Sequence, residues 1–127
     1  MLPVQLSPVR ELLASLHEAF TPLADVEETD EAFTVEIELP GVKLEDVSVE
    51  LAGSHLTVTG ERKERQRVGI LRRQTRTVGH FRYEVALPGE VEEAGVQASL
   101  NEGVLTVRVP KAASERPRRI PVKLGSA

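Results

Sequence analysis

Apolar and polar residues alternate over six short segments of the chain. A period of two places successive side chains on opposite faces, which is typical of a β-strand with one buried face. The alternating segments cover residues 33–39, 47–51, 56–58, 81–87, 96–100 and 105–109. Turn-forming pairs such as Pro40-Gly41 and Pro88-Gly89 separate them. Short strands at this spacing, with no helical pattern between them, predict an all-β, antiparallel, two-sheet sandwich.

One stretch interrupts this alternation. Residues 62–78 show no sustained apolar period, so they are predicted to form a long loop with a short strand around Ile70 and Leu71. Loops of this length in compact domains are usually functional or disordered. On the N-terminal side of the loop, segments 47–51 and 56–58 are predicted to pair as a hairpin.

The first 23 residues follow a helical period instead. Ser7 followed by Pro8 is typical of a helix start, because Ser caps the free N–H groups and Pro suits the first helical position. Thr21-Pro22 ends the segment. The apolar residues at helical spacing are Val9, Leu12, Leu13, Leu16 and Phe20. We predict a short amphipathic arm over residues 1–23, whose apolar face packs on the core or on another chain.

Composition excludes several classes of protein. A chain of 127 residues is long enough for one domain with flanking arms. It has no cysteine, so a disulfide framework and a thiolate metal site are excluded, and a reducing cytoplasm is the expected compartment. The longest apolar runs fall far short of the roughly 20 residues that span a bilayer, so we expect no stable membrane insertion. The N-terminal helix also lacks the cationic excess of a membrane-surface helix; its polar face holds Arg10, Glu11, His17 and Glu18.

Charge is distributed unevenly along the chain. Residues 24–50 hold ten acidic residues, and Lys43 is the only base among them. Residues 62–76 reverse this balance, with Glu64 the only acid. The bases there are Arg62, Lys63, Arg65, Arg67, Arg72, Arg73 and Arg76. A nucleic-acid interface is disfavoured because no aromatic residue is interleaved for stacking and the whole chain has a net charge of -4. A merely solvated loop remains an alternative.

The last residues contain an apolar segment beyond a polar linker. In an extended chain Ile120, Val122 and Leu124 project on one side, and Pro121 lacks an N–H, which suits addition to a sheet edge. We predict that residues 111–127 form an extended tail whose Ile120-Pro121-Val122 triplet anchors in another chain; a frayed terminus is the alternative. The nine residues 111–119 would let the anchor reach at most roughly 30 Å.

Catalytic chemistry has no support in the sequence. The histidines His17, His55 and His80 form no metal-binding pair and no nucleophile motif, and each is interpreted as a surface residue. There is no phosphate-binding glycine loop. We therefore expect no enzyme activity, no metal and no cofactor.

Several motifs together resemble one family. Ala98-Ser99-Leu100-Asn101-Glu102-Gly103-Val104-Leu105 and the following Thr106 to Lys111 are similar to the signature of the small heat-shock proteins, the α-crystallin family, bacterial type. The supporting matches are Glu38-Leu39-Pro40-Gly41-Val42, residues 56–62, Ala86-Leu87-Pro88-Gly89 and the Ile-x-Val tail. The family usually has Asn or Asp where this chain has Glu102. Since Glu accepts a positive φ less readily, the type of that turn stays open.

The resemblance implies an immunoglobulin-like sandwich over residues 24–110 and an ATP-independent chaperone, a holdase that binds partly unfolded clients. It also implies a homodimer formed by strand exchange and a higher homo-oligomer. The alternative is a non-catalytic β-sandwich interaction or co-chaperone module. In the dimer, the loop over residues 62–78 would reach the acidic first strand of a partner. The residues expected to meet there are Ile70, Leu71, Arg72, Arg73 and Arg76 with Asp25, Glu27 and Glu28.

Two further surfaces are predicted to bind protein chains. The anchor is expected to dock in a groove between two strand edges that a two-sheet core leaves partly uncovered. The groove residues are Val47, Val49, Leu51, Val96, Ala98 and Leu100. The apolar face of the N-terminal arm is expected to contact clients or other subunits.

Overall fold

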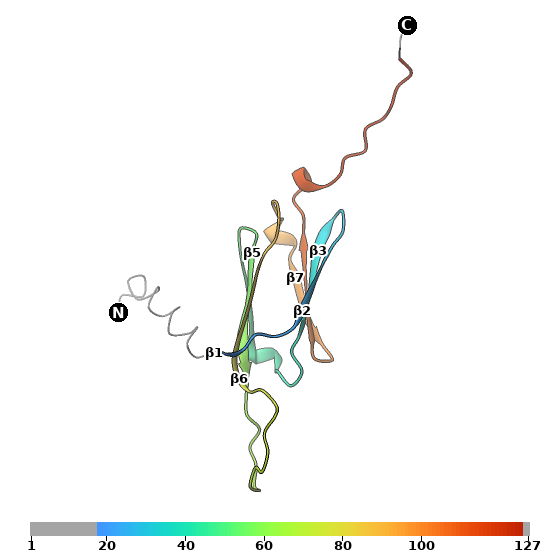
Figure 1. Cartoon of the computed structure of the whole chain (residues 1–127). Coiled ribbons are helices and arrows are strands. Elements are labelled where there is room, and N and C mark those ends of the chain that lie inside the picture. Colours follow the sequence, from blue (N-terminus) through green and yellow to red (C-terminus); the bar gives the residue numbers. More distant parts are fainter. Residues whose placement is uncertain (1–17, 126–127) are drawn as a thin grey trace, which may run out of the picture.

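A computed structural model describes residues 18–125 of the chain. Within that range, eight strands form two four-stranded sheets that lie face to face (Figure 1). The first sheet, in spatial order, contains β1 (Glu18–Phe20), β6 (Gly79–Ala86), β5 (His55–Arg62) and β4 (Val47–Ala52). The second contains β2 (Ala24–Glu28), β3 (Ala32–Glu38), β8 (Val104–Pro110) and β7 (Gln97–Asn101). Three short 3-10 helices connect strands or follow them: η1 (Leu44–Asp46), η2 (Glu93–Gly95) and η3 (Ala113–Glu115).

All neighbouring strands are antiparallel except β1 and β6, which are parallel. The predicted all-β, immunoglobulin-like sandwich is therefore confirmed. The hairpin of β4 and β5 pairs Val49 with Val58, and the hairpin of β7 and β8 pairs Leu100 with Leu105. Each of the six alternating segments of the sequence corresponds to a strand of the structure.

The core lies between the sheets and consists of the inward rows of β3, β5, β6 and β8. Because side chains alternate across a strand, every second residue of these strands points inward, and most of the inward residues of β3 and β8 are buried. The fully buried side chains of these strands and their flanks are Phe33, Val35, Ile37, Leu39, Leu56, Val58, Phe81, Val107 and Val109. With few aromatic residues, the core depends on close packing of branched aliphatic side chains.

The turn between β7 and β8 is a two-residue turn in which both central residues have positive φ. Glu102 has φ 51° and Gly103 has φ 78°, which is the type I′ geometry that matches the twist of a hairpin. Glu102 is the only non-glycine residue with positive φ in residues 18–125. The carbonyl of Gly103 also accepts a 2.7 Å hydrogen bond from the Leu39 amide, so this turn extends the pairing of β3 with β8 within the second sheet.

The predicted helical arm is wrong at its C-terminal end. Residues Glu18–Phe20 form β1, which runs beside β6. The Phe20 ring packs against the Phe81 ring, with 5.5 Å between their centroids. Tertiary packing on the sandwich therefore outweighs the helical spacing of Phe20. The remaining apolar residues of the predicted arm lie outside the described residues; they are Val9, Leu12, Leu13 and Leu16.

The short strand expected around Ile70 and Leu71 is also absent from the structure. No secondary structure occurs between β5 and β6, and both side chains are exposed. A strand needs a neighbour to pair its backbone groups, and this loop extends beyond the sandwich, where its own chain offers none (Figure 1). The part of the chain that the structure describes has no helix long and apolar enough to cross a membrane.

Candidate functional site

The edges β4 and β7 leave apolar side chains incompletely covered. Val47, Val49 and Leu51 of β4 lie on the inward row of the first sheet but are only half-buried. On the second sheet, Leu100 is half-buried and Ala98 is exposed, although each pairs with a buried inward residue of β8. Val96, just before β7, is half-buried as well. Apart from Ala98, all of these residues pack against the same core cluster. The six predicted groove residues therefore lie along two open edges.

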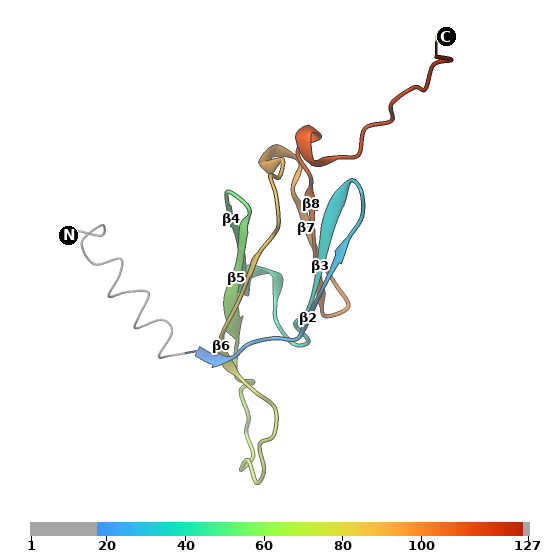
Figure 2. The same ribbon diagram turned by 45° about the horizontal axis from the view of Figure 1, so that its top comes forward.

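The anchor residues are exposed in the single chain. Ile120 is 75% exposed and Val122 is 96% exposed, so neither packs on its own sandwich. Leu124 is fully exposed on the same side of an extended chain. Residues 117–125 have no regular secondary structure and run away from the sandwich in both views (Figures 1 and 2).

The base of the tail is fastened to the domain, which differs from the expected nine-residue linker. The Ala112 amide donates a 2.9 Å hydrogen bond to the Glu90 carbonyl, and Arg116 Nε donates a 3.0 Å bond to the Lys111 carbonyl. Arg116 Nη2 also lies 3.6 Å from a carboxylate oxygen of Glu92. Sequence reasoning missed these contacts, because nothing in the polar run after Pro110 distinguishes a fixed segment from a free one.

The acidic strand β2 forms the other edge of the second sheet. Its pairing with β3 places Ala24, Val26 and Glu28 on the inward row, and Asp25 and Glu27 on the outward row. Val26 is 43% exposed, so this edge also leaves an apolar side chain uncovered. The outer face continues with Glu36 and Glu38 of β3, both exposed.

Glu28 does not belong to the outward acidic row. Its carboxylate lies 2.6 Å from Nζ of Lys111, a lysine that is only 8% exposed. The Lys111 ammonium group also lies 5.2 Å from the centre of the Phe33 ring. Of the three acids expected to meet a basic loop, Asp25 and Glu27 point outward, whereas Glu28 has a partner in its own chain.

The basic loop is fixed at its stem and exposed at its tip. Arg62 donates a 2.8 Å hydrogen bond to the Thr77 carbonyl and lies over the Phe20 ring at 4.6 Å. Burial, and secondarily the charge of Arg76, lower the pKa of Arg62. The next residue, Lys63, lies 3.0 Å from Asp46, and that hydrogen bond raises the pKa of Lys63.

The residues at the tip are free of such constraints within the described part of the chain. The apolar residues Val68, Ile70 and Leu71 are exposed, as are Arg72 and Arg73. Arg76 instead sits at the stem: its Nη2 atom lies 3.3 Å from the position of a Cβ on Gly41. No ion pair within residues 18–125 joins the loop to β2. Within one chain, the basic tip and the acidic edge of β2 therefore form no ion pair with each other.

The two histidines within the described residues lie on the outer face of the first sheet. His55 is 3.9 Å from Glu84, and His80 is 3.9 Å from Glu61. No group of three metal-ligating side chains occurs within the described range. His17 lies outside it.

Sequence comparison connects this architecture with known proteins. A model described as the Hsp20/alpha crystallin family matches residues 25–123, from β2 to the anchor. Spore protein SP21 of Stigmatella aurantiaca is 38% identical over 106 residues, which cover 82% of this chain and 63% of that protein. The 16.9 kDa class I heat shock protein 1 of Triticum aestivum is 41% identical over 96 residues, 73% of this chain and 64% of that protein. The chain thus spans less than two thirds of the length of these two relatives.

Solved structures give the same result. Heat shock protein 16.0 from Schizosaccharomyces pombe superposes with a TM-score of 0.71 at 29% identity, covering 84% of this chain and 99% of that one. A small heat-shock protein from Xylella fastidiosa, whose structure is described as a distinct high order structure, gives a TM-score of 0.68 at 32% identity, with coverages of 84% and 99%. The sandwich, the signature hairpin and the matched length together show that this chain belongs to the Hsp20/alpha crystallin family of small heat-shock proteins.

Proposed function

We propose that the protein is an ATP-independent holdase that binds partly unfolded proteins under heat or other stress and prevents their aggregation. Family membership implies a chaperone function. The observation that carries the finer proposal is the pair of open sandwich edges, β4 and β7, where apolar residues of the inward rows are half-buried, as Val49 is, or exposed, as Ala98 is. An unfolding client exposes extended apolar segments, and a sheet edge beside an apolar row suits such segments. Binding of this kind needs no nucleotide and no catalytic group.

Self-assembly would regulate access to these edges. We propose that Ile120 and Val122 of one subunit dock between β4 and β7 of another, with Ile and Val side chains filling the half-covered rows. Burying both side chains gives on the order of 3 to 6 kcal/mol before the cost of ordering the tail. One anchor is therefore weak, and an oligomer relies on many anchors acting together. Heating would release anchors and expose the same groove to clients.

The dimer in this proposal forms by exchange of the basic loop. The tip, with Ile70 and Leu71, would add a strand to the open edge of β2 in a partner, which would satisfy backbone groups that the single chain leaves unpaired. An apolar side chain of the tip would cover Val26. The outward acids Asp25 and Glu27 would then lie beside arginines of the tip.

The alternation of side chains along a strand limits which arginine of the tip can pair with the outward acids of β2. Because neighbouring residues of a strand face opposite sides, only one of Arg72 and Arg73 can share a face with Asp25 and Glu27. Each exposed pair is worth about 0 to 1 kcal/mol, so high salt should weaken the dimer only several-fold. Backbone pairing and apolar burial would contribute the remainder.

A charge-reversal series tests this arrangement. We expect Arg72→Glu or Arg73→Glu to weaken the dimer several-fold, and Glu27→Lys to restore it for one of the two but not for the other. Glu50→Lys is the matched control: it reverses an exposed acid on β4, an edge of the other sheet, so it should restore neither. Dimer dissociation constants from sedimentation at low salt are the measurement. If Glu27→Lys restores neither variant, the loop does not meet β2.

The holdase proposal is tested by protection of a heat-labile client. At about equal mass, the protein should suppress light scattering of the heated client equally well with and without ATP. An equal mass of an unrelated β-sandwich protein serves as the control. Scattering that rises as fast as with the control contradicts the proposal, and suppression that requires ATP contradicts the mechanism.

A non-catalytic interaction module remains the second candidate. Its supporting observation is the same pair of open edges, which also suits a fixed peptide ligand. A module of that kind would bind one folded partner and would leave an unrelated unfolding client unprotected.

The cytoplasm is the proposed location, because a chain without cysteine suits a reducing compartment.

A further inference from the structure

The base of the C-terminal tail is bound on several sides by its own domain. We define residues 111–116 as the collar. The Lys111 amide donates a 2.8 Å hydrogen bond to the Glu31 carbonyl, at the turn between β2 and β3. Val91 and Lys111 form an antiparallel bridge, and the Ala112 amide bonds to Glu90. The backbone of the collar is therefore paired with two separate segments of the sandwich.

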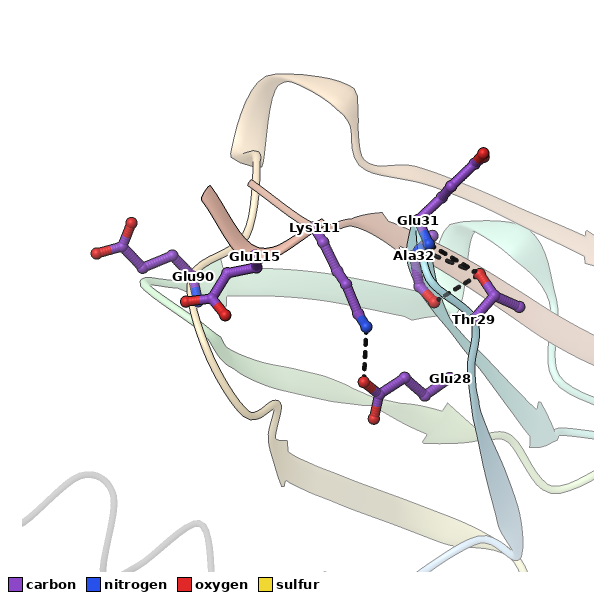
Figure 3. Close-up of polar contacts among 7 residues, drawn as sticks. All are labelled: Glu28, Thr29, Glu31, Ala32, Glu90, Lys111 and Glu115. Carbon is purple, nitrogen blue, oxygen red and sulfur yellow. Dashed lines mark hydrogen bonds and ion pairs between the residues drawn. The ribbon is translucent and has the colours of Figure 1, made fainter. Parts of the chain in front are cut away.

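Side chains strengthen this attachment (Figure 3). Glu115 Oε1 accepts a 3.3 Å hydrogen bond from the Glu90 amide, and its carboxyl group lies where Gly89 has no side chain: a Cβ there would stand 2.9 Å from Glu115 Cδ. Lys111 reaches across to Glu28 at the end of β2. Lys111 is buried, so removing the Glu28 carboxylate would leave its ammonium group poorly solvated and without a partner, and the contact therefore holds the base of the tail against β2.

The collar ends abruptly at a proline. Arg116 closes it by bonding to the Lys111 carbonyl and pairing with Glu92. Arg116 itself is extended, with φ -86° and ψ 141°, the conformation that a following proline favours. From Pro117 onward, no hydrogen bond or ion pair to the domain is found in the described residues up to 125. The free arm before the anchor is therefore residues 117–119.

A short arm with a fixed base restricts where the anchor can dock. The Cα atoms of Arg116 and Ile120 can be at most roughly 14 Å apart, compared with roughly 30 Å if the arm began at Lys111. Effective concentration is high for a groove at a matching distance and falls to zero for one that the arm cannot reach. Both views show the arm directed away from its own sandwich (Figures 1 and 2).

We infer that the collar selects the geometry of the oligomer: Glu115 and Arg116 act as positioning residues that aim the anchor at one location, the groove of a second copy of this chain. This inference rests on the proposed docking of the anchor. A fixed collar permits few subunit arrangements and gives a narrow distribution of assembly masses. A loose collar lengthens the arm to nine residues and permits many arrangements.

The test combines a local readout with an assembly readout. In Glu115→Ala/Arg116→Ala, loss of the collar's side-chain contacts should speed hydrogen exchange of the Lys111 and Ala112 amides roughly tenfold. Native mass spectrometry should show a distribution of oligomers broader than that of the wild type. The matched control Arg118→Ala removes a cation from the free arm and should leave both readouts unchanged.

A second variant avoids the collar altogether. Inserting Gly-Ser-Gly-Ser between Pro117 and Arg118 lengthens the arm, so it should broaden the mass distribution without changing exchange at Ala112. Unchanged exchange in the collar variant, or an unchanged mass distribution in both variants, would overturn the inference. The double substitution Ile120→Ala/Val122→Ala tests the docking of the anchor separately from the role of the collar. If it leaves the mass unchanged, the proposed anchor fails, and the inference about the collar fails with it.

Discussion

Replacing Ile120 and Val122 together by alanine should reduce the assembly to dimers. The two side chains are 75% and 96% exposed in the single chain, so the substitution removes nothing from the folded domain. It removes roughly 3 to 5 kcal/mol of apolar burial from each anchor contact, which weakens that contact by more than about a hundredfold. Because an oligomer held by many weak contacts loses all of them at once, the change in mass should be complete.

Light scattering coupled to size-exclusion chromatography measures this effect. Circular dichroism should show an unchanged β-sheet spectrum and an unchanged thermal midpoint of the domain. Lys123→Ala is the matched control, since it alters the same segment on the opposite side of an extended chain and should leave the mass unchanged. If the double variant elutes with the mass of the wild type, the anchor has no role in assembly.

Gly60→Ala should destabilise the sandwich strongly, although it adds only one methyl group. Gly60 lies on the inward row of β5, between Val47 and Phe81. A Cβ there would stand 2.6 Å from Cζ of Phe81 and would also meet the backbone carbonyl of Asp46. Neither neighbour can move freely, because the Phe81 ring is 1% exposed and packs against Phe20.

The expected loss is about 3 kcal/mol of the free energy of unfolding, with a midpoint at least roughly 10 °C lower. Gly69→Ala is the matched control: Gly69 lies in the exposed loop, and a Cβ there meets nothing within 4 Å. Combining Gly60→Ala with Phe81→Leu should cost less than the sum of the two single changes, because the smaller side chain makes room. A midpoint equal to that of Gly69→Ala contradicts the packing argument.

The strands could be predicted because their signal is local. Alternation with a period of two located β3 to β8, and turn residues located the ends of most of them. β1 could not be predicted in this way. Phe20 fits a helical spacing as well as a strand, and only its contact with Phe81, sixty-one positions away, decides between them. Propensity and period carry no information about such a contact.

The features of the candidate surfaces that depend on local sequence could also be predicted, and those that depend on distant contacts could not. The groove residues and the exposed anchor follow from alternation and from an apolar triplet without a core. The separate position of Glu28 does not follow, because the sequence places it with Asp25 and Glu27 in one acidic run. Its row in β2 and its buried partner Lys111 appear only in three dimensions. The collar could not be predicted from the sequence either, because its residues are mostly polar and the residues they contact lie in other segments of the chain.

The central claim, that the protein holds unfolding clients in a soluble form, is tested most directly by isolating the complex. A heat-labile client is heated alone and with the protein, cleared of aggregates, and analysed by size-exclusion chromatography with light scattering. The account predicts that, without nucleotide, client and protein elute together at a mass above that of the protein alone. Recovery of the client only in the pellet, with the protein eluting at its unmixed mass, would contradict the account.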